Sequence, residues 1–245
     1  MLWHNNHDGT FTDVAKETGT CETGWGWAAK FADLDNDGWQ DLFVVNGLRS
    51  AGKESYVPLI LPVITTPGLD ITDINSWPDI GNRTWSGYQK KKLFRNLGNG
   101  AFKNIAREAG VENDLDGRGI AVVDLDNDGR LDLVQTSADQ PLLLYHNVTE
   151  KSGNWIELKL IGTKSNRDAI GARVRVQAGG LTQIREVDGG NGFAGQSTRR
   201  VHFGLGKSAN IDSLQIRWPS GTTESVQVPM NRLTYIEEGR GVVSR

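Results

Sequence analysis

Several residue types are scarce in this 245-residue sequence, and each scarcity excludes a class of protein. The single cysteine, Cys21, rules out an internal disulfide and a cysteine-based metal site, and we expect it to be a small buried residue. No apolar run approaches the roughly 20 residues that span a membrane as a helix, and the first residues lack the basic start and apolar core of a signal peptide. Three of the four histidines (His4, His7 and His146) lie in or beside a repeated turn, which leaves little material for histidine catalysis.

The remaining composition is that of a globular protein with unevenly distributed charge. Residues 1–150 carry a net charge of −9, whereas residues 151–245 carry +6. Eight acidic residues of the first part belong to two repeated loops, so its acidity reflects those loops rather than an acidic surface. The basic part has no run of cations longer than Arg199-Arg200, which argues against nucleic acid as a partner.

A nine-residue loop of the pattern Asp-x-Asp-x-Asp-Gly-x-x-Asp occurs twice, at residues 33–41 and 124–132. Side chains at alternate positions of a tight loop converge, and the glycine permits the sharp turn. Hard oxygen donors in this arrangement suit Ca²⁺, so we expect two calcium sites. The predicted ligands are the side chains of Asp33, Asp35, Asp37, Asp41, Asp124, Asp126, Asp128 and Asp132, with the main-chain carbonyls of Trp39 and Arg130.

The loops differ from EF-hands, because their twelfth positions hold Val44 and Gln135 instead of glutamate and their flanks are typical of strands. Each loop is therefore expected to cap a β-hairpin. A solvated acidic turn is the alternative, and two identical Asp-Leu-Asp-Asn-Asp-Gly cores in the same context argue against it. The strand-like flanks are residues 28–32 and 42–45 around the first loop and residues 119–123 and 133–136 around the second.

An internal repeat with an offset of 91 residues includes both loops. Residues 2–15 align with residues 93–106, and a third start is visible at residues 144–147. Each unit contains four short strands, a pair around a tight turn followed by the loop hairpin, which predicts propeller blades. Residues 48–92 are a proline-rich insertion, which we expect to run over one face as a binding loop or as a lid on an exposed blade.

Residues 151–245 follow a different sequence pattern. Apolar and polar residues alternate strictly at 155–160, 172–176 and 214–218, and glycine-rich turns separate these stretches. Alternation of this kind predicts half-buried antiparallel strands. The fold class predicted is therefore all-β: a partial β-propeller of about two blades over residues 1–150, with the insertion at 48–92, followed by a small antiparallel β-sandwich-like domain over residues 151–245.

Both parts resemble known families. The Asp loops resemble those of FG-GAP/VCBS repeats in integrin-type β-propellers, and residues 166–174, 202–206 and 216–221 resemble the ASPIC/UnbV domain. The order of the two parts is similar to that in the cartilage-acidic-protein-1-like family. The resemblance implies a secreted or cell-surface calcium-binding protein with roles in adhesion and in matrix or carbohydrate association, and it implies no firmly attached reaction.

Members of that family carry further repeats and an export signal upstream, so we expect this chain to be the C-terminal portion of a longer protein or a truncated gene product. Two blades and the start of a third cannot close a ring, and unclosed blades expose strand edges. Three outcomes follow: the edges pair with missing blades, the chain associates with itself, or the insertion and the second domain cover the edges.

The function expected from these features is that of a non-enzymatic extracellular adhesion or binding module with structural calcium. One alternative is glycan binding by Trp77 and Trp85 of the insertion, whereas Trp25 and Trp27 are expected in the core. A less favoured alternative is a hydrolytic enzyme that uses the loop carboxylates or the pair Ser197 and His202. The expected partners are a glycan or an extracellular protein, without nucleic acid or a membrane span.

Overall fold

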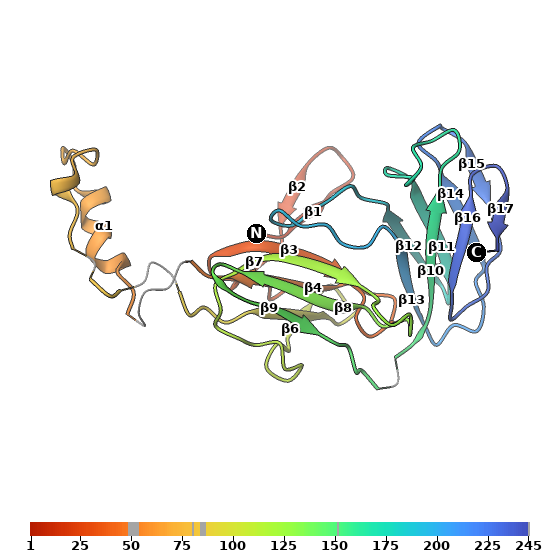
Figure 1. Cartoon of the computed structure of the whole chain (residues 1–245), viewed down its shortest axis with the longest axis horizontal. Helices are drawn as coiled ribbons and strands as arrows, with labels where there is room; N and C mark the ends of the chain where they lie inside the picture. The colour runs from red at the N-terminus through yellow and green to blue at the C-terminus, as the bar shows by residue number, and fades with distance from the viewer. Residues whose placement is uncertain (49–53, 80, 84–86, 151, 245) are drawn as a thin grey trace.

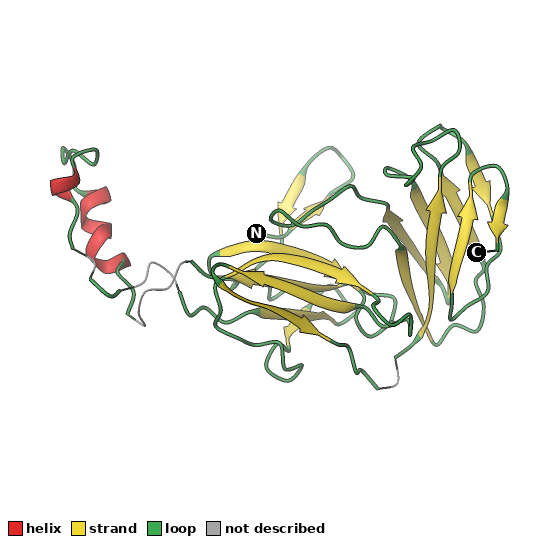
Figure 2. Ribbon diagram, viewed as in Figure 1, coloured by secondary structure: helices red, strands yellow, loops and turns green. Residues whose placement is uncertain are grey.

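The computed structural model describes residues 1–48, 54–79, 81–83, 87–150 and 152–244. Within these residues the chain forms seventeen strands, one α-helix and one short 3₁₀ turn, so the predicted all-β class is confirmed. Figure 1 shows two groups of sheets beside each other, formed by β1–β9 and by β10–β17, with helix α1 at one end of the molecule. Figure 2 shows the same view with strands in yellow.

Two sheets of the repeat region, defined as β1–β9, carry the Asp loops. Each loop joins a pair of antiparallel strands, β3 to β4 and β7 to β8, as the sequence predicts. The first sheet contains β3 (Gly26–Ala32), β4 (Asp41–Asn46), β5 (Lys92–Asn96) and β6 (Phe102–Asn104) in this order. The second contains β7 (Gly117–Val123), β8 (Asp132–Ser137) and β9 (Gln140–Tyr145), while β1 (Trp3–Asn5) and β2 (Phe11–Asp13) pair only with each other.

In the repeat region, each hydrogen-bonded sheet that carries an Asp loop begins two strands later than the corresponding repeat unit of the sequence. The loop hairpin of one unit pairs with the first two strands of the next unit, as β4 does with β5. The sequence grouped each loop hairpin with the strand pair before it, and this grouping is wrong because repeat boundaries carry no information about which neighbouring strands share hydrogen bonds. Fully buried side chains, among them Phe43, Val45 and Ile120, form a common core for the two sheets. Burial of one such side chain stabilises the fold by about 1.5–3 kcal/mol.

The sandwich, defined as β10–β17, consists of two four-stranded sheets around a second core that includes Phe203 and Trp218. The alternation seen in the sequence places every second residue of β11 in this core. One pair departs from the expected antiparallel arrangement, because β10 and β16 run parallel. The sheets are β13 (Val201–Gly206), β10 (Asn154–Ile161), β16 (Leu233–Glu237) and β17 (Gly241–Val243), and β12 (Leu181–Glu186), β11 (Arg173–Ala178), β14 (Ser213–Arg217) and β15 (Thr223–Ser225).

The insertion contains helix α1 (Val57–Thr65) and the 3₁₀ turn η1 (Ile74–Ser76). The sequence predicted an excursion over one face, but α1 lies away from the sheets (Figure 1). The helix was missed because prolines normally interrupt helices, although Pro58 occupies the first turn, where its lack of an N–H is tolerated. In the part of the chain that the structure describes, no helix is long and apolar enough to cross a membrane.

A long segment of the sandwich, residues 187–200, covers the innermost strands of the repeat region. The amide of Thr198 donates to the carbonyl of Val122 at 3.1 Å, and the Ser197 hydroxyl accepts from the amide of Val122 at 3.0 Å. Phe193 meets the ring of Trp27 edge-on, with ring centroids 5.0 Å apart. At this edge the second domain supplies cover, whereas the third expected outcome assigned the cover to the insertion and the second domain together.

Two smaller expectations about burial are wrong. Cys21 is exposed, because it lies in the polar connection between β2 and β3 and not in a strand. Trp25 is 47% exposed, because it precedes β3 instead of entering it. Trp27 is partly buried, beneath Phe193 and the guanidinium of Arg118, so it packs between the two parts of the chain.

Candidate metal centre

The first Asp loop brings three carboxylates together. Oxygens of Asp33, Asp35 and Asp37 lie within 4.8 Å of one another. The carboxylate of Asp33 accepts from the amides of Asp37 at 3.1 Å and Gly38 at 2.9 Å, and these bonds fold the loop over its first residue. Gly38 has φ +96°, a left-handed conformation that glycine adopts without strain.

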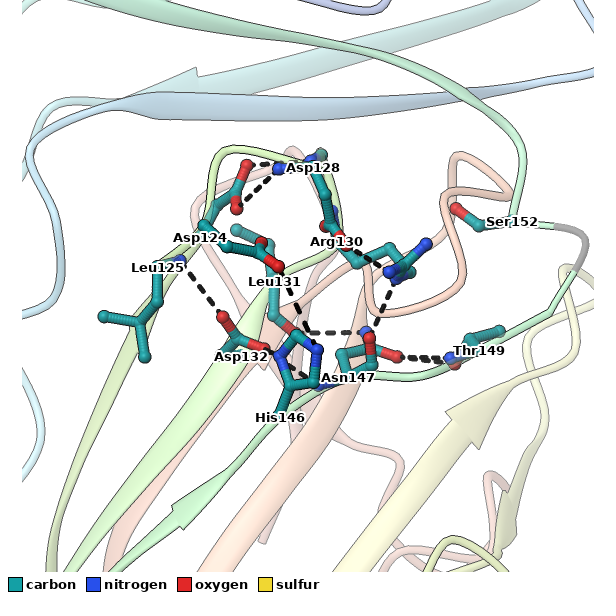
Figure 3. A network of polar contacts seen from close by, with 12 residues as sticks. Asp124, Leu125, Asp128, Arg130, Leu131, Asp132, His146, Asn147, Thr149 and Ser152 are labelled. Atoms are coloured by element: carbon teal, nitrogen blue, oxygen red, sulfur yellow. Dashed lines mark hydrogen bonds and ion pairs between the residues drawn. The ribbon is translucent and has the colours of Figure 1, made fainter.

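The second loop has the same geometry. Oxygens of Asp124, Asp126 and Asp128 lie within 4.8 Å of one another. Asp124 accepts from the amides of Asp128 at 3.2 Å and Gly129 at 2.8 Å, as drawn in Figure 3. Three of the four predicted aspartates in each loop are thus in position to share one cation.

The fourth predicted aspartate of each loop, Asp41 or Asp132, lies outside these converging groups and closes the loop. Asp41 accepts from the amides of Leu34 at 3.3 Å and Asn96 at 2.9 Å. Asp132 accepts from the equivalent amides of Leu125 and Asn147, at 3.0 and 2.8 Å (Figure 3). A ligand role for these two aspartates stays a prediction.

The seventh residues, Trp39 and Arg130, are held by their amides. Each donates to the fifth aspartate of its own loop at 2.8 Å, Trp39 to Asp37 and Arg130 to Asp128. This bond turns the chain back toward the triad of carboxylates. The predicted ligand role of the two carbonyls stays a prediction.

Two arginines and a histidine beside the carboxylates were missed by the sequence reading. Arg95 pairs with Asp35 at 2.5 Å, and the guanidinium of Arg130 pairs with Asp128. His146 lies 3.1 Å from Asp132 and 3.9 Å from Asp126. Arg95-Asn96 and His146-Asn147 occupy equivalent places at the repeated strand, and this equivalence is the signal that identifies them from the sequence.

Burial makes the carboxylates of the loops costly to ionise. Desolvation raises the pKa of Asp33 and of Asp41 to about 7, against the amide donors that lower it, and neighbouring aspartates raise it further. Desolvation also raises the pKa of Asp37 and of Asp124. The buried Oδ1 of Asp35 has no hydrogen-bond partner. Converging, desolvated carboxylate oxygens of this kind fit a hard divalent cation such as Ca²⁺.

The two loops contact each other through Asn36, which is fully buried in the first loop. Its side-chain amide donates to the carbonyl of Gly129 at 2.9 Å and to the hydroxyl of Ser152 at 2.7 Å. The main-chain carbonyl of Asn36 accepts from the amide of Gly206 at 2.8 Å. The first loop is therefore bonded to the second loop and to the sandwich at the same residue.

The sandwich also contacts the second loop directly. His202 Nε2 lies 3.0 Å from the carbonyl of Gly129, and burial lowers the pKa of His202 to about 4, so the ring is neutral at pH 7. The ring of Trp155 lies against Gly129, where an added Cβ would be 1.8 Å from it. Arg200 bridges Glu157 at 3.0 Å and Asn127 at 2.6 Å. Burial raises the pKa of Glu157 to about 7, although the charge of Arg200 lowers it.

The alternative site residues lie apart from the Asp triads. Trp77 is 37% exposed and its indole donates to the carbonyl of Ile71 at 2.9 Å, while Trp85 lies outside the described residues. Among the hydrogen bonds of the described residues, Ser197 bonds Val122 and His202 bonds Gly129, and none joins the two side chains. Ser197 and His202 do line one cavity, considered below.

Comparison with known proteins places both parts of the chain. A family model of FG-GAP-like repeats matches residues 1–44 and 72–135, and a model named ASPIC and UnbV matches residues 162–243. The chain is 28% identical over 250 residues to cartilage acidic protein 1 of Xenopus tropicalis and 26% identical over 266 residues to that of Homo sapiens, which covers 90% and 97% of this chain. It spans 38% and 40% of the length of these relatives. The first part of the chain thus matches FG-GAP-like repeats and the second part matches the ASPIC and UnbV model, and most of the chain is similar to cartilage acidic protein 1.

Proposed function

We propose that this chain is a non-enzymatic, extracellular calcium-binding module for adhesion or binding, in which Ca²⁺ in both hairpin loops is structural. The observation that carries the proposal is the pair of converging Asp triads, Asp33, Asp35 and Asp37 and their counterparts Asp124, Asp126 and Asp128. In each triad the first aspartate is almost fully buried. A cation that binds the folded loops and not the unfolded chain stabilises the fold by mass action.

A structural role suits the position of the loops better than a catalytic one. The first loop is covered by the sandwich, since an added Cβ on Gly204 would lie 2.1 Å from Asp33 and 2.5 Å from Asn36. A catalytic metal needs an open coordination position that substrate can reach. Calcium in this loop would instead fix the surface on which the sandwich rests.

An extracellular location is supported by the chemistry of the sites and by the relatives. Extracellular calcium modules work with dissociation constants of roughly 10⁻⁴–10⁻³ M, in the range of calcium outside cells. The relatives carry the name cartilage acidic protein 1. We propose an extracellular protein or a glycan as the partner.

The β1–β2 hairpin supports a further proposal about partners. In the repeat region, β5 and β9 are the strands that correspond to β1, and each pairs with an Asp-loop hairpin. Strand β1 itself pairs only with β2. Trp3 and Phe11 of this hairpin are 57% and 59% exposed. By the repeat, His4 and Asn5 correspond to Arg95 and Asn96, which contact the first Asp loop. We therefore propose that β1 pairs with a further Asp-loop hairpin, from a longer chain or a second copy.

The proposed function is tested by a binding screen of the chain in calcium and in chelator, against arrays of glycans and of extracellular proteins. Saturable binding to one of these classes that is lost with chelator supports the proposal. Turnover of polysaccharide or ester substrates that a single substitution such as Ser197→Ala abolishes would contradict the non-enzymatic assignment.

A further inference from the structure

A cavity of about 340 Å³ lies between the repeat region and the sandwich, beside the first Asp loop. Its walls come from β3 and β7 on one side and from β12, β13 and the segment 187–200 on the other. Cavities at such junctions, of about 300–1,000 Å³, are where small ligands usually bind. Its polar lining includes Lys30, Arg185, Arg200, Ser197, Thr198 and His202.

Arg185 is the cation of this cavity that is left without a carboxylate partner. It lies on the edge strand β12 opposite Val174, a core residue, so it points to the inner side of its sheet, over the ring of Phe203 at 5.4 Å. Its guanidinium donates only to neutral oxygens, the carbonyl of Ile184 and the side chain of Gln183, both at 3.0 Å. Over the described ranges of the chain it forms no ion pair.

The other two cations are already paired. Lys30 lies 3.4 Å from Asp188, and Arg200 lies 3.0 Å from Glu157. Two further carboxylates line the cavity: Glu186, which pairs with Arg173 at 3.5 Å, and Asp33, whose charge acts on Arg185. If Asp33 holds calcium, as proposed above, the guanidinium of Arg185 is left to attract an anion from solution.

His202 also lines the cavity. The residue is 8% exposed, and its Nε2 lies 3.0 Å from the Gly129 carbonyl, which can only accept. The hydrogen of the neutral ring is therefore on Nε2, and the lone pair is on Nδ1. Nδ1 is buried and has no partner. Because Nδ1 is enclosed by protein atoms and Nε2 is bonded to Gly129, the ring lines the cavity without offering a hydrogen bond to a ligand.

We propose that this cavity binds a small carboxylate that carries hydroxyl groups, with the size and chemistry of a hexuronic acid. The carboxylate pairs with Arg185. The hydroxyl of Ser197 has an accepting bond from Val122, and its hydrogen is available to a second ligand oxygen. This site is distinct from Trp77 and Trp85 of the insertion, and only the release of Arg185 from Asp33 rests on the proposed calcium site.

The test is isothermal titration of the whole chain in calcium-containing buffer with glucuronate, with glucose as the neutral analogue and with sulfate as the simple anion. We expect saturable binding of glucuronate and weaker or no binding of glucose and sulfate. Arg185→Met should weaken glucuronate binding on the order of tenfold or more, because a charged hydrogen bond is lost. Arg175→Met is the matched control, since Arg175 is exposed on the outer side of the neighbouring strand.

Arg185→Lys, which retains the charge, is the second variant if Arg185→Met does not fold, and it should weaken binding less than any neutral replacement. The ¹⁵N resonances of the Arg185 guanidinium should shift when glucuronate is added. No glucuronate binding, equal binding of sulfate, or equal effects of the Arg185 and Arg175 variants would overturn the proposal. Melting of the same samples in calcium and chelator tests the calcium sites separately, so failure of one proposal is distinguishable from failure of the other.

Discussion

The side-chain amide of Asn36 donates to the carbonyl of Gly129 at 2.9 Å, which joins the fourth residue of the first Asp loop to the sixth residue of the second. These residues are 93 positions apart in the chain. Gly129 also accepts from His202 of the sandwich. The two loops and the sandwich therefore meet at the carbonyl of Gly129. A substitution in one loop should change the stability of the other loop.

Removing this bond should uncouple the loops. Asn36→Gly keeps the left-handed backbone at φ +59° and deletes one buried and one partly buried hydrogen bond, so the free energy of unfolding should fall by about 1–3 kcal/mol. Asn127→Gly is the control, because Asn127 has φ +60° at the same position of the second loop and its side chain makes one exposed bond, to Arg200, in place of the buried bond between the loops. Urea unfolding of both variants measures the difference. Equal destabilisation by the two substitutions would contradict the coupling.

Each Asp triad should hold one calcium ion. Asp33→Asn and Asp124→Asn should each reduce the stoichiometry measured by calorimetric titration from two ions to one, because each removes a charged oxygen from a different triad. Asp114→Asn is the control, since Asp114 is half exposed and lies 3.9 Å from Lys90 away from both loops. Two ions bound by either loop variant with unchanged affinity would argue against the assigned ligands.

Gly204 packs so closely against the first Asp loop that a side chain at this position does not fit. In Gly204→Ala the new methyl group would meet Asp33 at 2.1 Å and Asn36 at 2.5 Å, so the sandwich must shift from the loop. We expect the free energy of unfolding to fall by about 1–3 kcal/mol and the affinity of the first calcium site to fall with it. Gly26→Ala is the matched control, because its methyl group would meet Val44 at 3.6 Å, an ordinary contact. Similar losses in both variants would contradict the close fit.

The stability of the metal-free chain should depend on pH in a defined direction. Asp33, Asp41 and Glu157 have pKa values of about 7 in the folded chain, above their ordinary values of 3.8 and 4.5, so the folded state binds more protons in between. The free energy of unfolding should therefore fall as pH rises toward and through 7. Buried His202, with a pKa of about 4 against an ordinary 6.5, acts in the opposite direction only below pH 6.5.

Unfolding in urea at pH 6.5 and at about pH 7.5, with chelator and with saturating calcium, measures this effect. The fall should be larger with chelator than with calcium, because bound calcium keeps the loop aspartates ionised while Glu157 still titrates. The same pH dependence in both conditions would show that the loop carboxylates do not hold the ion.

The sequence predicted the Asp loops and their hairpins because those features are local and occur twice. Alternation likewise predicted the strands of the sandwich, as in β11. The bond between Asn36 and Gly129 and the bridge from Arg200 to Asn127 lay beyond sequence reasoning, because 93 and 73 residues separate the partners and no local pattern marks them. Helix α1 was missed because Pro58 and Pro62 suggested a loop.

The central claim is that calcium in the two Asp loops holds the repeat region and the sandwich together. Its most direct test is thermal melting of the chain, first shown to be metal-free by elemental analysis, with chelator and with millimolar calcium. At 100 times the dissociation constant each site adds about 2.7 kcal/mol, which raises the melting midpoint by roughly 5 °C or more. A midpoint that is the same with chelator and with calcium would contradict the account.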